Sequence, residues 1–431
     1  MGNISVTSRP TASDTTGPTP ASLRPVRGEG HANLRVMIYS QDGLGLGHLR
    51  RTSAIARELI EHIPGTNVLT CMDSPRGPFF QPVPGHDHLK LPGIVKHGPG
   101  QWRPQTMSLE FAQLRALRAK VLCSVAEEFQ PDLLLVDHMP HGATGELLAT
   151  LNFLRSRRPR TKIVLGLRDI LDDATVVSRV WNGEGALTAL AEFYDSMIIY
   201  GAREIFDAGN EYGFDAVMGE SIYYSGYVGL EGSDKKPKDK GGRWLIFAMA
   251  GGGADGYPMM RAVVDSFKQV NKLRPCTMVL ATGPFMPADL VKDLRKRATS
   301  ESIKIKTTVK DPWRYLRSAD TVVSMAGYNS SVEILQSGCQ AILVPRPGPS
   351  AEQSMRARMF AEQGWVRTIH PADLTPQSMA DEIAGCFSQA MQVRRRPSEA
   401  MLGGRRNSVG LLAALLGIEV APRPRAQVAG S

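Results

Sequence analysis

Residues 324–338 read SMAGYNSSVEILQSG, and this stretch decides the fold class of the 431-residue chain. It lies between two short apolar runs, Thr321–Val323 and Ala341–Val344, which predict β-strands. Within it, Asn329–Gln336 has the spacing of a helix, and Gly338 is a residue type that commonly follows a helix end. A strand, a helix and a strand in this order predict a parallel βαβ unit.

Small and hydroxylic residues open the predicted helix. At Gly327, Ser330 and Ser331, backbone N–H groups and hydroxyls would meet the positive end of the helix dipole, which suits a diphosphate. Glu333 falls one turn into the helix, where its carboxylate can accept from both hydroxyls of a ribose. The alternative for Glu333 is a capping acid that serves only the helix N-terminus.

The alternation of strand and helix continues on both sides of this unit. In the first half the expected strands are Arg35–Ser40, Asn67–Cys71, Asp132–Val136, Lys162–Leu167 and Ser196–Tyr200, with helices over His48–His62, Ser108–Phe129 and Gly142–Arg155. In the second half the further strands are Trp244–Ala248, Thr277–Ala281 and Ile303–Thr307, with helices over Tyr257–Asn271, Pro287–Ala298 and Ala351–Gln363. Strands alternating with helices of this length predict α/β domains with parallel sheets.

A polar linker divides the chain into two α/β halves. Residues 231–242 are charged and lack large apolar groups, which separates an N-terminal domain at 33–230 from a C-terminal domain at 243–417. Residues 1–32 and 418–431 are expected to be disordered, because they cannot bury enough apolar surface. Ligands of parallel sheets bind outside the carboxyl ends of the strands, so the cleft between the halves is the expected site.

Each half carries a glycine-rich turn after its first strand. In the second half Gly251, Gly252 and Gly253 offer backbone donors for phosphate. In the first half the loop contains Gly45 and Gly47 and runs directly into His48 at the expected helix start. The GxGxG spacing followed by histidine disfavours a dinucleotide fingerprint, which needs GxGxxG. His48 is a candidate general base, or a residue that only orients the loop.

Further polar residues follow two other strands of the first half. Asp137 and His138 come directly after one strand, and Arg168 follows the next. Asp137 could orient His138 or activate an acceptor hydroxyl itself. With His141, Asp137 and His138 lack the ligands of a tetrahedral zinc site, so we predict no metal.

The motifs together resemble glycosyltransferase family 28, the group that includes the N-acetylglucosaminyltransferase of peptidoglycan synthesis. The resemblance covers about residues 34–415, and its GLGH, DH and GGYN-like elements are similar to those of a bacterial branch of predicted glycosyltransferases. The residues that carry it are Gly327, Ser330, Ser331, Glu333, Gly338, Val344, Pro345, Glu352 and Gln353, with the loop 43–48. This chain departs from the family pattern at Arg356, where the family has asparagine.

The resemblance implies a GT-B fold with two Rossmann-like domains facing a central cleft. A nucleotide-sugar donor would bind the C-terminal domain, with Glu333 on the ribose, Gly327, Ser330 and Ser331 on the diphosphate, and Glu352 and Gln353 on the sugar. An acceptor would bind the N-terminal domain near His48. The implied reaction is an inverting sugar transfer without metal or other cofactor, most simply from a UDP-sugar. The alternatives are a sugar-nucleotide 2-epimerase and a non-catalytic nucleotide-sugar-binding protein.

Charge and composition limit the partners. Of the formal net charge of +9, residues 393–431 carry +5 and residues 1–32 carry +1, so the body is nearly neutral and we expect no nucleic-acid surface. No apolar run is long enough to span a membrane, there is no signal-peptide pattern, and the five scattered cysteines suit a reducing cytoplasm. The apolar stripes 109–122 and 411–416 are expected to pack in cores. The alternative is that they contact a membrane surface peripherally, which a lipid-linked acceptor would require. The acceptor is expected to be either a small molecule or lipid-linked.

Overall fold

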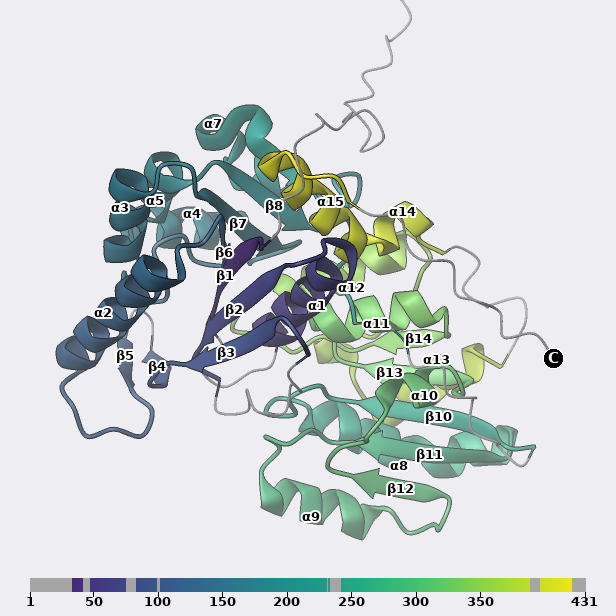
Figure 1. Cartoon of the computed structure of the whole chain (residues 1–431). Helices are drawn as coiled ribbons and strands as arrows, with labels where there is room; N and C mark the ends of the chain where they lie inside the picture. The colour runs from purple at the N-terminus through teal and green to yellow at the C-terminus, as the bar shows by residue number, and fades with distance from the viewer. Residues whose placement is uncertain are drawn as a thin grey trace, which may run out of the picture.

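The computed structural model describes residues 33–41, 47–74, 83–98, 101–230, 232, 242–387 and 396–420. Each half of this part of the chain is built on one parallel sheet, which confirms the predicted α/β class (Figure 1). The first sheet has the strand order β3-β2-β1-β6-β7-β8-β9, and the second has the order β12-β11-β10-β13-β14-β15. In both sheets the first strand of the half has a neighbouring strand on each side. The turn that follows it therefore lies in the middle of the sheet's carboxyl edge, where ligands of parallel sheets bind.

The first sheet contains every strand predicted for that half. Its strands are β1 (Arg35–Ser40), β2 (Asn67–Met72), β3 (His86–Lys90), β6 (Leu133–Asp137), β7 (Lys162–Arg168), β8 (Ser196–Tyr200) and β9 (Ile222–Tyr224). The outer strands β3 and β9 were not predicted. They are short, and β3 contains His86, Asp87 and His88, which hide the apolar pattern of a strand.

Helices connect these strands and cover the sheet. In chain order these helices are α1 (Gly47–His62), α2 (Phe111–Phe129), α3 (Leu148–Arg157), α4 (Ala174–Gly183), α5 (Ala186–Phe193), α6 (Ala208–Glu211) and α7 (Asp215–Met218). The predicted start of α3 at Gly142 was wrong, because Gly142 and Gly145 both adopt positive φ and keep the segment before Leu148 out of the helix. An antiparallel hairpin, β4 (Ile94–Gly98) and β5 (Gln101–Pro104), was also not predicted.

The second half repeats the pattern with a smaller sheet. Its strands are β10 (Trp244–Met249), β11 (Cys276–Ala281), β12 (Ile303–Lys306), β13 (Thr321–Ser324), β14 (Ala341–Leu343) and β15 (Arg367–Thr368). Its helices are α8 (Tyr257–Leu273), α9 (Ala288–Arg297), α10 (Pro312–Leu316), α11 (Tyr328–Ser337), α12 (Glu352–Glu362) and α13 (Pro376–Gly385). The βαβ unit predicted at 321–344 is therefore β13, α11 and β14, and Gly338 ends α11 in the left-handed conformation.

The last helices return to the first half. After α14 (Glu399–Leu402), α15 (Gly404–Leu416) packs against α1 and β8 (Figure 1). Leu411 and Leu412, part of one predicted apolar stripe, are buried there. The sequence-based boundary at 417 counted this segment with the C-terminal domain, whereas its packing ties it to the N-terminal one.

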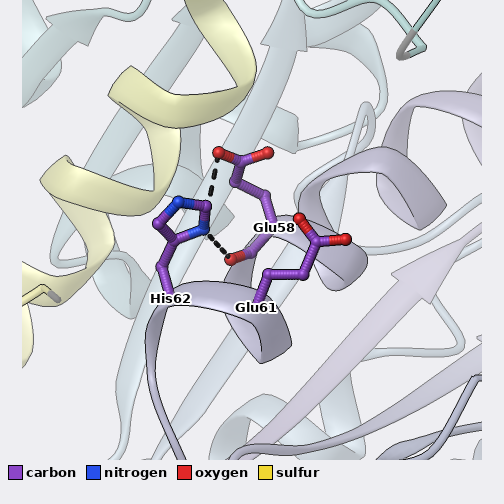
Figure 2. A group of neighbouring side chains, drawn as sticks. All are labelled: Glu58, Glu61 and His62. Atoms are coloured by element: carbon purple, nitrogen blue, oxygen red, sulfur yellow. Dashed lines mark hydrogen bonds and ion pairs between the residues drawn. The ribbon is translucent and has the colours of Figure 1, made fainter. Parts of the chain in front are cut away.

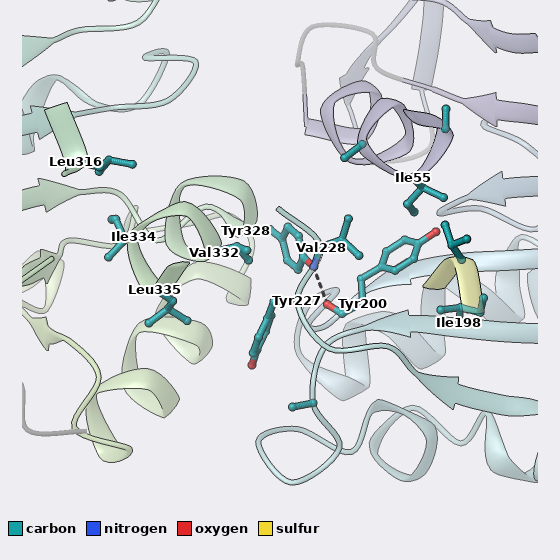
Figure 3. Packing of buried hydrophobic residues seen from close by; sticks show 14 of the residues in the cluster. Ile55, Ile198, Tyr200, Tyr227, Val228, Leu316, Tyr328, Val332, Ile334 and Leu335 are labelled. Carbon is teal, nitrogen blue, oxygen red and sulfur yellow. Dashed lines mark hydrogen bonds between the residues drawn. The ribbon is translucent and has the colours of Figure 1, made fainter. Parts of the chain in front are cut away.

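One hydrophobic core cluster runs through both halves. It includes Ile38 from β1, Val332 from α11 and the connecting residues Tyr227 and Val228. Figure 3 shows Tyr200, Tyr227 and Tyr328 packed where the halves meet. Because buried apolar surface continues across the junction, the two halves stand in a defined relation to each other.

Candidate active site between the two domains

The predicted residues His48 and Asp137 meet at the carboxyl edge of the first sheet. Asp137 ends β6, which pairs with β1, and His48 lies in the first turn of α1, which follows β1. The His48 Nδ1 lies 3.1 Å from the Asp137 Oδ2. Gly47 opens α1, while Gly45 lies outside the described residues.

Arg51 completes this pair and was missed by the sequence analysis. One of its guanidinium nitrogens donates to both Asp137 oxygens at 2.8 Å. Burial alone would raise the pKa of Asp137, but Arg51 and His48 outweigh it and hold that pKa well below its usual range. The carboxylate therefore stays ionised. The signal available in the sequence was the spacing of three residues between His48 and Arg51, which puts both on one helix face.

The ionised carboxylate fixes the tautomer of His48. A carboxylate only accepts hydrogen bonds, so the contact with Asp137 needs a proton on Nδ1 and directs Nε2 away from the pair, although an Arg51 nitrogen also lies 3.1 Å from Nδ1. The side chain of His48 is 21% exposed, whereas that of Asp137 is fully buried. His48 is therefore an oriented histidine with access to the cleft, which is the arrangement that a general base needs.

His138 lies behind this pair. Its backbone has φ 86°, an uncommon conformation for a residue with a side chain, and its ring centroid lies 5.5 Å from that of His48. Burial, followed by electrostatic interactions with His48 and Arg168, lowers the pKa of His138 well below its usual value. His138 is therefore neutral and does not carry charge into the site.

The predicted absence of a metal site at Asp137, His138 and His141 is untested. Within the described residues, the geometry of a three-ligand metal group occurs at Glu58, Glu61 and His62 on α1 instead (Figure 2). Glu58 already forms an ion pair with Arg405 of α15, which supplies the charge that a cation would. We therefore do not propose a metal ion at Glu58, Glu61 and His62.

Across the junction, the N-terminus of α11 holds the predicted donor residues. Gly327 is the N-cap, and Ser331 and Glu333 are each 1% exposed. Within the described part of the chain, the Ser331 Oγ and the Glu333 Oε2 have no hydrogen-bond partner. Buried polar atoms are normally paired, so these two lack the partners that such atoms usually have. Ser330 lies beside them at 9% exposure.

The second glycine turn lies next to this helix end. Gly251 and Gly253 have φ of 60° and 93°, a region that favours glycine. A Cβ added to Gly251 would lie 3.7 Å from the Ser330 Oγ, and one on Gly253 would lie 2.1 Å from the Thr282 carbonyl oxygen. Gly252, between them, accepts from the Phe285 N–H. The predicted turn and the predicted helix therefore do come together.

The two predicted sugar-side residues lie at the start of α12. An Arg168 guanidinium nitrogen lies 2.7 Å from Glu352, and the Gln353 Oε1 accepts from the Arg346 N–H at 3.2 Å. Arg168 comes from β7 of the first half, so the ion pair with Glu352 joins the two domains. A residue predicted for the acceptor side and one predicted for the donor side are therefore in direct contact.

Two further ion pairs cross between the domains. Arg50 of α1 pairs with Glu333 of α11. Arg356 of α12 makes two hydrogen bonds to Asp169, at 3.0 and 2.6 Å, and donates to the Ala326 carbonyl oxygen. The arginine that replaces the family's asparagine thus forms a buried interdomain contact. The sequence analysis did not predict either pair.

Comparison with known proteins agrees with this architecture. Residues 248–409 match the glycosyltransferase family 28 C-terminal domain. The second half of the chain therefore contains a glycosyltransferase family 28 C-terminal domain, and the chain is a glycosyltransferase. A curated relative, the UDP-N-acetylglucosamine–N-acetylmuramyl-(pentapeptide) pyrophosphoryl-undecaprenol N-acetylglucosamine transferase of Leuconostoc citreum, is 24% identical over 80% of this chain and 87% of the relative.

Solved structures support the GT-B fold of this glycosyltransferase. The kitacinnamycin glycosyltransferase has a TM-score of 0.60 and 15% identity, covering 89% of this chain and 99% of that one. A putative UDP-N-acetylglucosamine 2-epimerase from Listeria monocytogenes has a TM-score of 0.58 and 13% identity, covering 89% and 96%. At these identities the likeness concerns the fold alone.

None of the described helices has the length and apolarity to cross a membrane.

Proposed function

We propose that this glycosyltransferase moves a sugar from a nucleotide diphosphate donor to an acceptor hydroxyl, with inversion and without a metal. The observation that carries the proposal is the meeting of two helix N-termini. The Asn329 Nδ2 of α11 donates to the Gly47 carbonyl oxygen of α1 at 3.1 Å. The oriented His48 therefore stands close to the helix end with the unpartnered Ser331 and Glu333 atoms.

The reaction follows from these positions. The Nε2 of His48 takes the proton of the acceptor hydroxyl, and the acceptor oxygen bonds to the anomeric carbon of the donor sugar. The bond from that carbon to the β-phosphate oxygen breaks, and its electron pair stays on the oxygen. Backbone N–H groups and hydroxyls at Gly327, Ser330 and Ser331 receive the diphosphate, in place of a metal ion.

The remaining predicted residues take supporting roles in this proposal. Glu333 binds the ribose hydroxyls, the turn Gly251–Gly253 lies along the phosphates, and Glu352 and Gln353 bind the sugar. Gly47, His138 and Arg168 line the acceptor side with Asp137, which holds His48. The named substrate of the Leuconostoc relative makes UDP-N-acetylglucosamine the first donor to test, and a lipid-linked diphosphate the first acceptor beside small molecules.

The direct test is transfer by the purified full-length protein. Release of UDP from a panel of UDP-sugars is measured with and without acceptors, and the anomer of the product is assigned by NMR. We expect His48→Ala to lower kcat by about 10²–10⁴-fold, the usual contribution of a general base. The exposed His370, in the second half, is the control: His370→Ala leaves turnover unchanged. Equal turnover of His48→Ala and wild type would contradict the assignment of the base.

An epimerase is the second candidate, because the Listeria epimerase has nearly the same TM-score as the kitacinnamycin glycosyltransferase. The two functions differ in their need for an acceptor. Conversion of UDP-N-acetylglucosamine to its 2-epimer without any acceptor would favour the epimerase. Transfer that needs an acceptor and is unchanged by EDTA would support the metal-independent transferase.

A further inference from the structure

Arg50 occupies the carboxylate that is assigned to the donor ribose. Within the described residues, Arg50 is the only ion-pair or hydrogen-bond partner of the Glu333 side chain, and it reaches only Oε1. The other oxygen, Oε2, has no partner. Glu333 is 1% exposed, so a carboxylate in this position needs compensation by a cation or by hydrogen-bond donors.

Two hydroxyls can supply that compensation. A ribose presents neighbouring 2′ and 3′ hydroxyls, which can donate to the two oxygens of one carboxylate. Binding of a ribose at Glu333 would satisfy the free Oε2 and would take Oε1 from Arg50. The side chain of Arg50 is 26% exposed and makes one ion pair with the described part of the chain, so it can leave its partner without crossing a packed core.

The other arginines of the cleft are less free to move. Arg51 and Arg356 each hold both oxygens of a buried carboxylate, Asp137 and Asp169 respectively. Glu352 lies within 2.7, 3.7 and 3.8 Å of three different arginines, so it stays compensated if one of them leaves. At Glu333, by contrast, ligand and arginine compete directly for one site.

Arg50 also lies where a leaving group needs positive charge. It is two residues from His48 in the first turns of α1, and that turn contacts the N-terminus of α11 through Asn329. The groups at the α11 N-terminus are neutral backbone and hydroxyl donors. A cation that approaches from α1 would add charge to these dipoles, and charge-assisted hydrogen bonds are about twice as strong as neutral ones.

We propose that Arg50 exchanges partners during turnover. It pairs with Glu333 before the donor binds and moves to the donor diphosphate once the ribose hydroxyls occupy the Glu333 oxygens. As the bond from the anomeric carbon to the β-phosphate oxygen breaks, the electron pair left on that oxygen adds one negative charge, which Arg50 faces. The proton of the acceptor goes to His48. This inference rests on the proposed function, since it needs a ribonucleotide diphosphate donor.

The exchange predicts opposite effects on two simple ligands. Uridine has the ribose but no diphosphate, so it competes with Arg50 and gains nothing from it. UDP has both. We expect Arg50→Ala to tighten uridine binding several-fold and to weaken UDP binding by about tenfold or more, the usual loss for a charge-assisted contact. Both affinities are measured by titration calorimetry on the full chain.

Matched variants separate the charge from the fold. Arg50→Lys keeps the charge and should recover part of the UDP affinity and of kcat, whereas Arg50→Gln should not. Arg57→Ala removes an exposed arginine from the same helix and should leave both affinities unchanged. Thermal unfolding of each variant identifies those that fail to fold. If Arg50→Ala fails to fold, the affinities of Arg50→Lys are compared with those of wild type instead.

Other outcomes have distinct meanings. If wild-type protein binds UDP and Arg50→Ala changes uridine and UDP affinity in the same direction, the exchange is overturned and the proposed function stands. If Arg50→Ala binds UDP as tightly as wild type does, the exchange is likewise overturned while the proposed function stands. If wild-type protein binds no nucleoside diphosphate among UDP, GDP and dTDP, the proposed function itself fails.

Discussion

Among the arginine–carboxylate pairs that join the domains, two differ in how far water reaches them. In the pair of Arg356 with Asp169, the side chains are 0% and 4% exposed and two hydrogen bonds connect them. In the pair of Arg50 with Glu333, the arginine is 26% exposed and makes a single ion pair among the residues that the structure describes. A fully buried pair cannot open without leaving charges in a low-dielectric interior, whereas a partly exposed arginine can be solvated. The same chemistry thus gives a fixed contact in one place and an exchangeable contact in the other.

The largest expected effect tests the fixed contact. Arg356→Ala leaves Asp169 charged and buried without its partner, so we expect a loss of about 3–5 kcal/mol in the free energy of unfolding. Denaturant unfolding measures the loss. Arg358→Ala is the control on the same helix, because its pair with Glu362 is 66% and 64% exposed and should contribute less than about 1 kcal/mol. Equal losses in the two variants would contradict the comparison.

The second prediction concerns His86, whose protonation lowers the free energy of unfolding in acid. Burial, with smaller effects of His88 and Arg57, lowers the pKa of His86 from 6.5 to about 4. The folded protein then binds fewer protons than the unfolded chain between these values. Stability is therefore present above about pH 6.5 and is lost progressively down to about pH 4, by about 3 kcal/mol.

The measurement for His86 is unfolding free energy against pH. His86→Gln should flatten the decline between about pH 6.5 and pH 4 relative to wild type. His88→Gln, two residues along the same strand and only partly buried, should flatten it less. An unchanged slope in His86→Gln would mean that other groups cause the acid loss.

The third prediction concerns the exchangeable pair. Burial raises the pKa of Glu333 and Arg50 opposes the rise, so Arg50→Ala should raise it further. A carboxyl whose pKa is raised in the folded state takes up protons on folding, so its cost appears as the pH rises through that pKa. We expect Arg50→Ala to lose about 1–3 kcal/mol at neutral pH and much less in acid. A loss as large as that of Arg356→Ala would show that the two pairs do not differ.

The smallest expected effect lies at the edge of the same interface. The Asp172 Oδ1 accepts from the Ala351 N–H at 2.8 Å, which is a neutral donor from the other domain. Asp172→Ala should cost about 0.5–1.5 kcal/mol, the usual net value of one hydrogen bond, because the second bond to this oxygen, from the neighbouring Asp173 N–H, is exposed to water. Asp172→Asn keeps the acceptor oxygen and should restore most of the loss in the same unfolding assay. No recovery would assign the effect to charge.

Much of the fold could be predicted because its signals are local. β1 and β8 have the predicted bounds, and α8, α9, α11 and α12 begin or end within two residues of prediction. Apolar runs, helical spacing and a glycine after the helix are all contained in a few neighbouring residues. The edge strands β3, β9 and β15 and the hairpin β4–β5 were missed because each is short or lacks a continuous apolar run.

The candidate site divides in the same way. His48, Asp137, Ser331 and Glu333 were found because each follows a strand or opens a helix, and such positions share one edge of a parallel sheet. Their roles in binding and catalysis stay predictions. Arg50, Arg51 and Arg356 were missed as site residues, since an arginine on an amphipathic helix has the same local pattern whether it faces water or a distant carboxylate.

The sequence by itself thus determined two α/β halves, the glycine-rich turns and the helix ends that can receive a diphosphate. Only the tertiary structure decided which charges meet. Asp169 and Arg356 are 187 residues apart, and Arg50 and Glu333 are 283 apart. No local pattern encodes contacts at such separations, because they exist only when one continuous core sets the two sheets in their relative positions.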